Sequence, residues 1–430
     1  MGKLHDKLAQ QIPGLRGGAH SLIKDHGSMV ISEVTISQAF GGMRGVKGLV
    51  CDTSVVEPDR GLIVRGIPIS DLTQKLPEEI FYLLLTGELP DASELASLQE
   101  EFRLRAQVPS YVWDVLRALP LGSHPMAMFS SAILAMEGDS EFRRRYTEGL
   151  HKDEYWESTL DDALTLLARL PAIAAGIYRI HARKGEPLPS NPGLDWGGDY
   201  AAMLGLPDPA GDFKNFIRLY LTLHCDHEGG NVSAFTCHTV GSALSDPFYA
   251  VSAGMNGLAG PLHGLASQEC LHFVLDIRKM YNGVPGDEQL ADYIREKLKD
   301  GRVIPGYGHA VLRVTDPRFT AFHEFGLRVC PDNEIFRIVD RLFHVAPGIL
   351  KEQGKIKDPW PNVDAGSGSL LYLFGLTELD YYTVLFGVSR ALGMCAQLVL
   401  NRALGTPITR PKSVSTDWIK CTVSSSARVA

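Results

Sequence analysis

The chain has 430 residues, of which 45% are hydrophobic and 21% charged, and its formal net charge is −8. These values are ordinary for a soluble globular protein with one large and one smaller domain, or with two comparable domains. Because no basic run occurs, nucleic acid and anionic membranes are poor candidates as partners.

The compartment is expected from the chain start and the cysteines. The first residues, MGKLHDKLAQQIPG, lack the continuous apolar core of a secretory signal. The seven cysteines are scattered and none forms a CxxC pair, which indicates free thiols in a reducing compartment. Since the chain starts at Met1 without a transit peptide, we expect a cytoplasmic protein, with the mitochondrial matrix as the alternative.

The first predicted elements are two short strands within residues 49–67, LVCDTSVV and GLIVRGI. They are rich in β-branched side chains, and Pro58 and Gly61 between them suit a turn. Other strand signals are rare. The expected fold is therefore all-α, with many helices and only a minor β-hairpin.

Apolar residues recur at helical spacing in the later segments. LPEEIFYLLLTG has Pro77 near its start and Gly87 just past its end, as helices often do. Three longer stripes follow: Leu160, Ala163, Leu164, Leu167 and Leu170; Phe213, Phe216, Ile217, Tyr220 and His224; and Tyr382, Leu385, Ser389, Leu392 and Ala396. Residues 184–199 predict a surface loop, and residues 300–309 and 353–368 are irregular.

Two histidines stand close together in LHCDHEGGNVSAFT. His224 and His227 are three residues apart, which predicts neighbours on a helix that stops at Gly229 and Gly230. Both would be hydrogen-bonded core histidines in the simplest interpretation. A zinc site is a less favoured one, because HExxH and a further ligand at a typical offset are absent.

His263 follows Pro261 directly before a predicted helix that starts near Ala266. The positive end of a helix dipole disfavours imidazolium, so this histidine is expected to be neutral. A neutral imidazole in this position can donate a hydrogen bond to a developing oxyanion. The alternative is a histidine that serves only as a poor helix cap.

The segment GRVIPGYGHAVLRVTDPRFT contains two glycines, Gly306 and Gly308, which allow backbone to approach a ligand closely. It is neither a Walker A motif nor a dinucleotide fingerprint. Asp316 and Pro317 predict a helix start, which puts Arg318 in the first turn, where the helix dipole is unfavourable to a cation. Either an anionic ligand or a surface salt bridge would explain it.

A second acidic and basic set lies towards the carboxyl end. Asp364 precedes small residues and an apolar helix, so it is either a helix N-cap or a carboxylate base in a glycine-rich pocket. Arg390 is flanked by core side chains, and Arg410 follows the long predicted helix. Each arginine alone could be an ordinary ion-pair partner.

Eight segments together resemble the citrate synthase family, in that family's order, between about residues 25 and 417. They are GGMRGVKGL, DHEGGNVSA, GLAGPLHGLA, PGYGHAVLR, TDPRF, PWPNVDA, LFGVSRALG and RPKS. The similarity is nearest to the mitochondrial type. It implies a homodimer with shared active sites, a large helical domain (1–265 plus 370–430) and a small, mobile, coenzyme A-binding domain (266–369).

The resemblance also assigns roles by position. It implies a catalytic trio of His263, His309 and Asp364. It implies oxaloacetate contacts from His227, His309, Arg318 and Arg390, and from Arg410 in the site of the partner subunit. It implies coenzyme A contacts from Arg313, Lys355 and the loop residues Val303, Ile304, Gly306, Tyr307, Gly308 and Ala310, with Arg44 and Lys152 reaching across from the other subunit.

The sequence departs from the animal enzymes of the family at three positions. Gly366 and Phe235 stand where those enzymes carry histidine, and Lys152 stands where they carry arginine. Lysine keeps the charge but loses the bidentate fork, so the phosphate contact of Lys152 is the weakest assignment. None of the departures touches the catalytic trio.

The implied activity is condensation of acetyl-CoA with oxaloacetate and hydrolysis of citryl-CoA, the first reaction of the tricarboxylic acid cycle. Acetyl-CoA is a substrate, and no cofactor or metal is expected. The nearest alternative is a 2-methylcitrate synthase that uses propionyl-CoA. Two others are a non-catalytic helical dimer that binds metabolites and a zinc hydrolase that uses His224 and His227.

Overall fold

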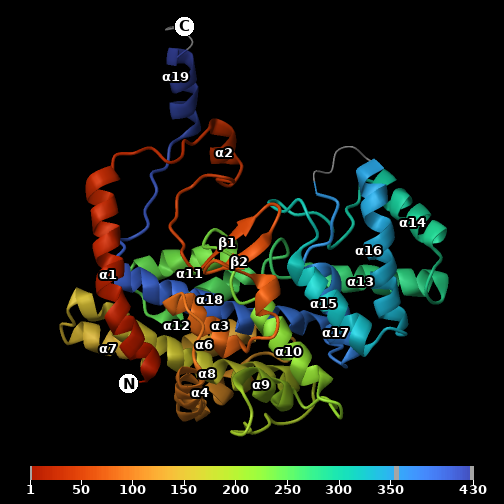
Figure 1. The fold of residues 1–430 in the computed structure, drawn as a ribbon, viewed down its shortest axis with the longest axis horizontal. Coiled ribbons are helices and arrows are strands. Elements are labelled where there is room, and N and C mark those ends of the chain that lie inside the picture. Colours follow the sequence, from red (N-terminus) through yellow and green to blue (C-terminus); the bar gives the residue numbers. More distant parts are fainter. Residues whose placement is uncertain (1, 353–357, 427–430) are drawn as a thin grey trace.

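The computed structural model describes residues 2–352 and 358–426, and the chain is mainly helical (Figure 1). The helices are α1 (Lys3–His26), α2 (Ile36–Phe40), α3 (Pro77–Thr86), α4 (Ala92–Arg105), α5 (Ser110–Ala118), α6 (Pro125–Ala135), α7 (Glu141–Thr147), α8 (Tyr155–His181), α9 (Trp196–Leu204), α10 (Asp212–Leu223), α11 (Val232–Ser242), α12 (Pro247–Leu258), α13 (Ala266–Tyr281), α14 (Asp287–Lys299), α15 (Pro317–Val329), α16 (Glu334–Glu352), α17 (Asp364–Leu373), α18 (Tyr382–Leu404) and α19 (Thr416–Ser426). Short 3₁₀ helices are η1 (Ile69–Leu72), η2 (Met136–Asp139), η3 (Lys152–Glu154) and η4 (Leu379–Tyr381).

The predicted hairpin is part of a small antiparallel sheet. Strand β1 (Ser54–Glu57) pairs with β2 (Gly61–Val64), so the turn expected between Pro58 and Gly61 is confirmed. Gly61 has φ +81°, which favours glycine there. A two-residue strand, β3 (Ile67–Pro68), adds to β2, while residues 49–53 stay outside the sheet.

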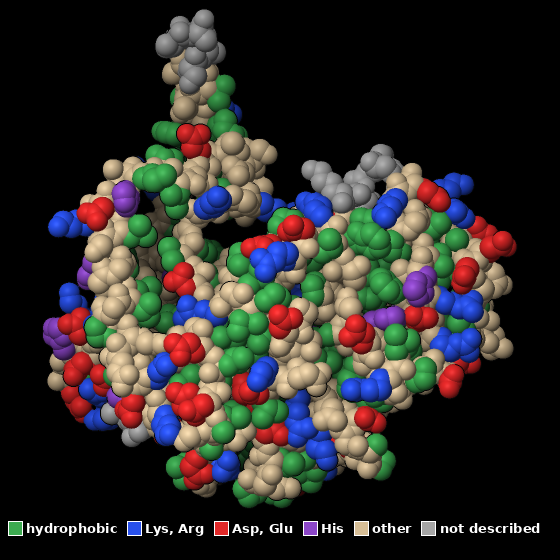
Figure 2. All heavy atoms as spheres, in the orientation of Figure 1, with side chains coloured by type: hydrophobic (Ala, Val, Ile, Leu, Met, Phe, Trp, Pro, Cys, Tyr) green, Lys and Arg blue, Asp and Glu red, His purple; other side chains and the backbone are tan. Residues whose placement is uncertain are grey.

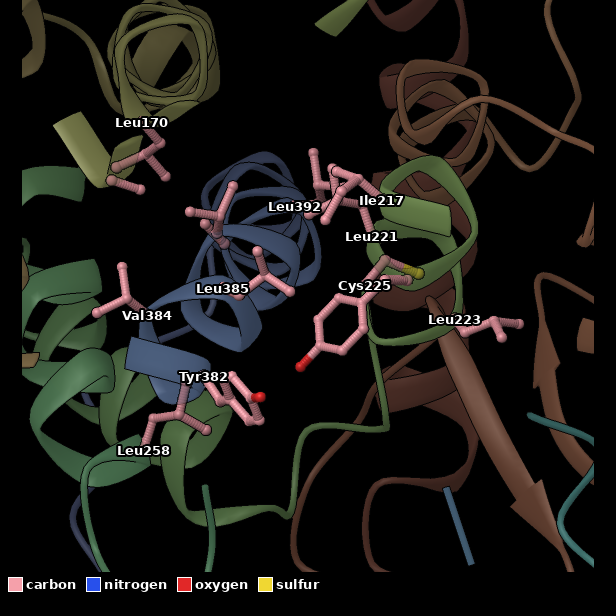
Figure 3. Packing of buried hydrophobic residues seen from close by; sticks show 14 of the residues in the cluster. Leu170, Ile217, Leu221, Leu223, Cys225, Leu258, Tyr382, Val384, Leu385 and Leu392 are labelled. Carbon is pink, nitrogen blue, oxygen red and sulfur yellow. The ribbon is translucent and has the colours of Figure 1, made fainter. Parts of the chain in front are cut away.

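Helix α18 forms the centre of the core and packs against α3, α8, α10, α11 and α12. Figure 3 shows Leu385 and Leu392 of α18 among apolar side chains of its neighbours, including Leu170 of α8 and Ile217 of α10. Every residue of the three predicted stripes is buried, so the helical periodicity is confirmed. By length and composition, the segments 152–181 and 379–404 could cross a membrane, but 72% and 94% of their apolar windows are buried in this core.

Helix boundaries agree with the sequence at some ends and differ at others. Pro77 and Gly87 flank α3 as expected, with Gly87 left-handed at φ +78°. Helix α10 ends at Leu223, however, so the prediction that His224 and His227 share a helix is wrong. His224 is the last, capping residue, and His227 lies in the turn that follows, because Asp226 is bonded to strand β1 instead of continuing the helix.

Helices α13 to α17 gather at one side of the molecule, to the right in Figure 1, and pack mainly on one another. We call them the α13–α17 group, and the remaining helices except α2 and α19, with the sheet, the main body. Aromatic rings join the two parts: Phe216 of α10 lies 5.7 Å from Phe322 and 5.5 Å from Phe325 of α15, centroid to centroid.

The termini and the surface differ from this compact arrangement. Helices α2 and α19 project from the main body (Figure 1). Figure 2 shows basic and acidic side chains interspersed over the visible face, in keeping with the modest net charge. The predicted loop 184–199 gives way to helix α9 at Trp196, and of the irregular stretch 353–368, residues 353–357 lie outside the described part and α17 begins at 364.

Candidate active site

His227 and His309 come from different parts of the fold and meet at the junction of the main body and the α13–α17 group. His227 lies in the turn between α10 and α11, and His309 in the loop between α14 and α15. Their ring centroids are 5.8 Å apart, and the two ring planes make an angle of 64°. Burial lowers the pKa of His227 well below its usual value, and the charges of Arg318 and Arg390 lower it further.

The hydrogen bonds of His309 determine its tautomer. Its Nδ1 accepts the backbone N–H groups of Val311 and Leu312, each at 3.0 Å. Nδ1 is therefore unprotonated, and the proton of the neutral ring is on Nε2. Burial and the charge of Arg318 lower the pKa of His309, which keeps the ring neutral. His309 is thus a neutral proton donor through Nε2.

His263 has the opposite tautomer to His309. Its Nε2 accepts the backbone N–H of Ser233 at 3.3 Å and lies 2.9 Å from the Ser233 hydroxyl. The proton is therefore on Nδ1. Burial lowers the pKa of His263 to about 4, and the charge of Arg390 adds to this. The expectation of a neutral imidazole just before α13 agrees with this geometry, although the ring caps nothing in that helix.

Asp364 is the first residue of α17. The alternative in which it only caps that helix is wrong, because Val363 occupies the N-cap. Within residues 2–352 and 358–426 its carboxylate accepts no hydrogen bond, although its own N–H donates to the Asn362 side chain at 3.0 Å. Burial raises the pKa of Asp364 to about 6, against the lowering effect of the Arg318 and Arg390 charges. Such a carboxylate suits a general base at neutral pH.

Arg318 is buried and bonded to Asp316 rather than exposed in a surface salt bridge. Its Nε and Nη2 donate to the two carboxylate oxygens at 3.0 and 2.7 Å. Asp316 also caps α15, as predicted, by accepting the Arg318 N–H at 2.9 Å. Burial raises the pKa of Asp316, but the charge and hydrogen bonds of Arg318 outweigh it and hold the pKa below its usual value.

Arg390 is 2% exposed on α18, in the middle of the core. Its Nε donates to the His224 carbonyl at 3.1 Å, and its guanidinium lies 4.9 Å above the Phe386 ring. Burial lowers its pKa to about 10, so it stays charged at neutral pH. Among the described residues it forms no salt bridge with a carboxylate, which leaves its charge for an anionic ligand.

The charges of the two arginines act on the pKa values of the other candidate residues. Arg318 affects the pKa of His227, His309 and Asp364, while Arg390 affects those of His227, His263 and Asp364. The structure therefore gathers four predicted residues, three histidines and one aspartate, around two predicted and buried arginines. Sequence reasoning missed the pairing of Asp316 with Arg318, and it missed Ser233 and Phe386, whose only signals are a serine at a helix start and an aromatic residue one turn before Arg390.

The glycine loop that precedes His309 packs on residues 358–365. Gly306 O accepts the N–H of Asn362 at 2.8 Å, and a Cβ on Gly306 would lie 2.8 Å from the Ala365 Cα. The close neighbour that its φ of +79° permits is therefore the protein backbone at Ala365. Gly308 O accepts the Asn362 side-chain amide at 3.0 Å. In this loop Ile304 is buried, Gly306, Tyr307 and Gly308 are half-buried, and Val303 and Ala310 are exposed.

The other predicted coenzyme A contacts lie on the surface. Arg44, Lys152 and Arg313 are exposed, and the Arg313 backbone N–H donates to the Pro58 carbonyl at 2.7 Å. Lys355 lies outside the described residues. Arg410 is exposed beyond α18 and is not brought to the site of its own chain by any described contact.

His224 is a core histidine. It is buried, stacks on Tyr220 at 4.2 Å and has Nδ1 3.0 Å from the Tyr220 carbonyl. In the described ranges, no group of three or more His, Cys, Asp or Glu side chains is placed to hold a metal ion. The proposed zinc pair of His224 and His227 thus has no third protein ligand in that part of the chain.

Comparisons with known proteins agree on one family. Residues 42–412 match the family described as citrate synthase, C-terminal domain. The chain is 49% identical to a probable mitochondrial citrate synthase of Glossina morsitans morsitans and 47% identical to the mitochondrial citrate synthase of Saccharomyces cerevisiae. Each alignment covers 97% of this chain, and 91% and 89% of those proteins.

Solved structures share the fold. The citrate synthase of Pyrobaculum aerophilum aligns over 87% of this chain and 92% of its own, with a TM-score of 0.77 and 29% identity. A Thermoplasma acidophilum citrate synthase, solved as a ternary complex with carboxymethyl coenzyme A and oxaloacetate, aligns over 90% of this chain and 96% of its own, with a TM-score of 0.74 and 24% identity. From its sequence, its helical fold and these likenesses, the chain belongs to the citrate synthase family.

Proposed function

We propose that this protein condenses acetyl-CoA with oxaloacetate and hydrolyses the resulting citryl-CoA, the first reaction of the tricarboxylic acid cycle. The observation that carries the proposal is that the charges of two buried guanidinium groups act on the carboxylate of Asp364, whose pKa is raised, and on two neutral imidazoles of defined tautomer. An enolisation needs this combination, because the acetyl methyl is a very weak acid and one base alone cannot remove its proton.

Each side chain has a distinct part in the proposed reaction. Asp364 removes a methyl proton while His263 Nδ1–H donates to the thioester oxygen. His309 Nε2–H donates to the oxaloacetate ketone and makes its carbon electrophilic. Arg318 and Arg390 bind the carboxylates, where guanidinium forks fit well. Each positioned acid–base contact contributes about 10²- to 10⁴-fold in rate.

We further propose that the α13–α17 group acts as a small mobile domain, residues 266–369, which closes over oxaloacetate. Closure would exclude water while the enol exists and would delay thioester hydrolysis until both substrates are bound. The location of His309 and Arg318 in this group, with His227 and Arg390 in the main body, supports the proposal. Helix α17 spans the proposed boundary at residue 369.

We also propose a homodimer with shared sites. The segments that project from the main body carry exposed apolar side chains, including Val30 (72%), Phe40 (69%) and Trp418 (56%), which a second copy would cover. Arg410 would then complete the oxaloacetate site of the partner. Coenzyme A would meet Arg313 and the 303–310 loop in one subunit and Arg44 and Lys152 of the other.

Mixed dimers test this sharing. Chains inactivated by Arg410→Ala and chains inactivated by Asp364→Asn should regain activity when combined, because each dimer then holds one intact site. The measurement is thiol release by purified heterodimers carrying two different tags. Heterodimers that stay as inactive as the two parent variants would contradict a shared site.

Two expectations remain part of the proposal. No metal or other cofactor is needed, and acetyl-CoA is a substrate. As to location, the names of the two relatives refer to mitochondrial proteins, which favours the matrix and gives no support to the cytoplasmic expectation.

The decisive assay is thiol release from acetyl-CoA with and without oxaloacetate, in the presence of a chelator. We expect release only when oxaloacetate is present and no effect of the chelator. The same assay with propionyl-CoA tests the 2-methylcitrate alternative through the ratio of kcat/KM values. A preference for propionyl-CoA, or no turnover at all, would overturn the proposed activity.

A further inference from the structure

The mechanism above gives no role to the buried carboxylate of Asp226. It stands directly before His227 and is 0% exposed. Its Oδ2 accepts the hydroxyls of Thr53 at 2.5 Å and Ser54 at 2.8 Å, and its Oδ1 accepts the Gln397 amide at 2.8 Å. These donors come from the start of the sheet and from α18, so Asp226 ties three remote segments together.

The residue after His227 is held by the same strand. Glu228 adopts φ +59°, a left-handed conformation that is uncommon for a residue with a side chain. Its N–H donates to the Ser54 hydroxyl at 2.9 Å, and its carboxylate accepts the Val56 N–H at 2.7 Å. His227 is therefore fixed on both sides by residues that bond to β1.

Helix α18 holds the turn from the other direction. The Gly393 N–H donates to the Cys225 carbonyl at 3.0 Å, and Arg390 donates to the carbonyl of His224. A Cβ on Gly393 would collide with the Asp226 carboxylate, so only glycine permits this approach. The turn that carries His227 is thus set against the helix that carries Arg390.

Holding a turn with a buried carboxylate carries an unfavourable desolvation free energy. Taking the charge out of water costs several kcal/mol, and well-packed apolar residues often stabilise a fold better. Here burial raises the pKa of Asp226, while the hydroxyl and amide donors and the charge of Arg390 oppose that rise. The arrangement fits a group retained for geometry at the site.

We propose that Asp226, held by Thr53, Ser54 and Gln397, is a positioning residue for oxaloacetate binding. It fixes the turn so that the His227 ring lies beside His309, where both can contact the substrate. The proposal rests on the proposed role of His227 in that site. Asp226 itself is not expected to touch the substrate.

The test removes the two hydroxyl donors and substitutes no charged residue. In the double variant Thr53→Val with Ser54→Ala, we expect the KM for oxaloacetate to rise about tenfold, as the loss of about 1.4 kcal/mol of hydrogen bonding implies. The KM for acetyl-CoA, measured at saturating oxaloacetate, and kcat should change less than twofold. An oxaloacetate KM within twofold of the parent value would overturn the proposal.

Matched variants separate this role from general destabilisation. Thr159→Val removes the hydroxyl of a buried threonine that donates to the Tyr155 carbonyl within α8, and should leave both KM values unchanged. If the double variant does not fold, Gln397→Met removes the third donor and must give the same selective rise. His227→Ala distinguishes the two levels of failure: an unchanged oxaloacetate KM there would remove the role of His227 itself.

Discussion

On the oxaloacetate side of the proposed site, Arg318 and Arg390 are 3% and 2% exposed, and hydrogen bonds fix both guanidinium groups. On the coenzyme A side, Arg44, Lys152 and Arg313 are all exposed. Buried charges act in a low dielectric, whereas exposed ones are screened by water and salt. The affinity for oxaloacetate should therefore depend on a few residues. The affinity for coenzyme A should depend on small contributions from many residues.

The largest expected effect is at Asp364, where the two sides meet. Asp364→Asn should lower kcat about 10²- to 10⁴-fold with little change in either KM, because only the proton transfer is lost. The raised pKa means that ionised Asp364 opposes folding, a cost absent near pH 4 and complete above pH 6. The variant should therefore melt above the parent at pH 8. Near-normal turnover would remove Asp364 as the base.

Binding on the oxaloacetate side should weaken when one arginine is replaced by lysine, which keeps the charge but changes its shape. Arg390→Lys loses the fork and the bond to His224, and should raise the KM for oxaloacetate about 10- to 100-fold. Arg318→Lys can still pair with Asp316, so a smaller rise is expected. Equal effects of the two substitutions in steady-state kinetics would show that the Asp316 pairing does not distinguish the two arginines.

The parts of this site that could be read from the sequence are those that depend on local periodicity. Helices α8 and α18, and hence the buried position of Arg390, follow from apolar spacing. The turn at His227 does not, because the donors that draw Asp226 out of the helix lie more than 170 residues away. The tautomers of His263 and His309 likewise depend on backbone N–H groups whose directions only the fold defines.

The family resemblance implies roles for individual residues, but it does not predict the local contacts that those residues make. The approach of the glycine loop to a ligand stays a prediction, and the structure adds that the close neighbour of Gly306 within the protein is Ala365. Asp316 was expected as a helix cap, and the structure adds its pairing with Arg318, two residues on. Helix α17 begins one residue earlier than the capping alternative requires, so Asp364 is its first residue and its carboxylate does not cap the helix. Tertiary contacts decide helix boundaries at this level of detail.

The pH profile tests the electrostatics common to both sides. Burial raises the pKa of Asp364 to about 6, and the base must be ionised to act. The value of kcat/KM for acetyl-CoA should thus be constant above pH 7 and fall about tenfold per unit below pH 6. Burial holds the pKa of His263 at about 4, so this histidine adds no inflection near neutrality. Constant kcat/KM down to pH 5 would contradict the proposed state of Asp364.

The smallest effect is expected on the coenzyme A side, at Lys152. An exposed charge contact contributes about 0 to 1 kcal/mol, so Lys152→Met should raise the KM for acetyl-CoA at most about fivefold and leave the KM for oxaloacetate unchanged. The rise should shrink as salt is added, since a phosphate contact at the surface is screened. Lys279→Met, at an exposed lysine in the last turn of α13, is the matched control and should change neither KM. A salt-independent rise of a hundredfold would mean that Lys152 is buried in the working enzyme, and the contrast between the two sides would then fail.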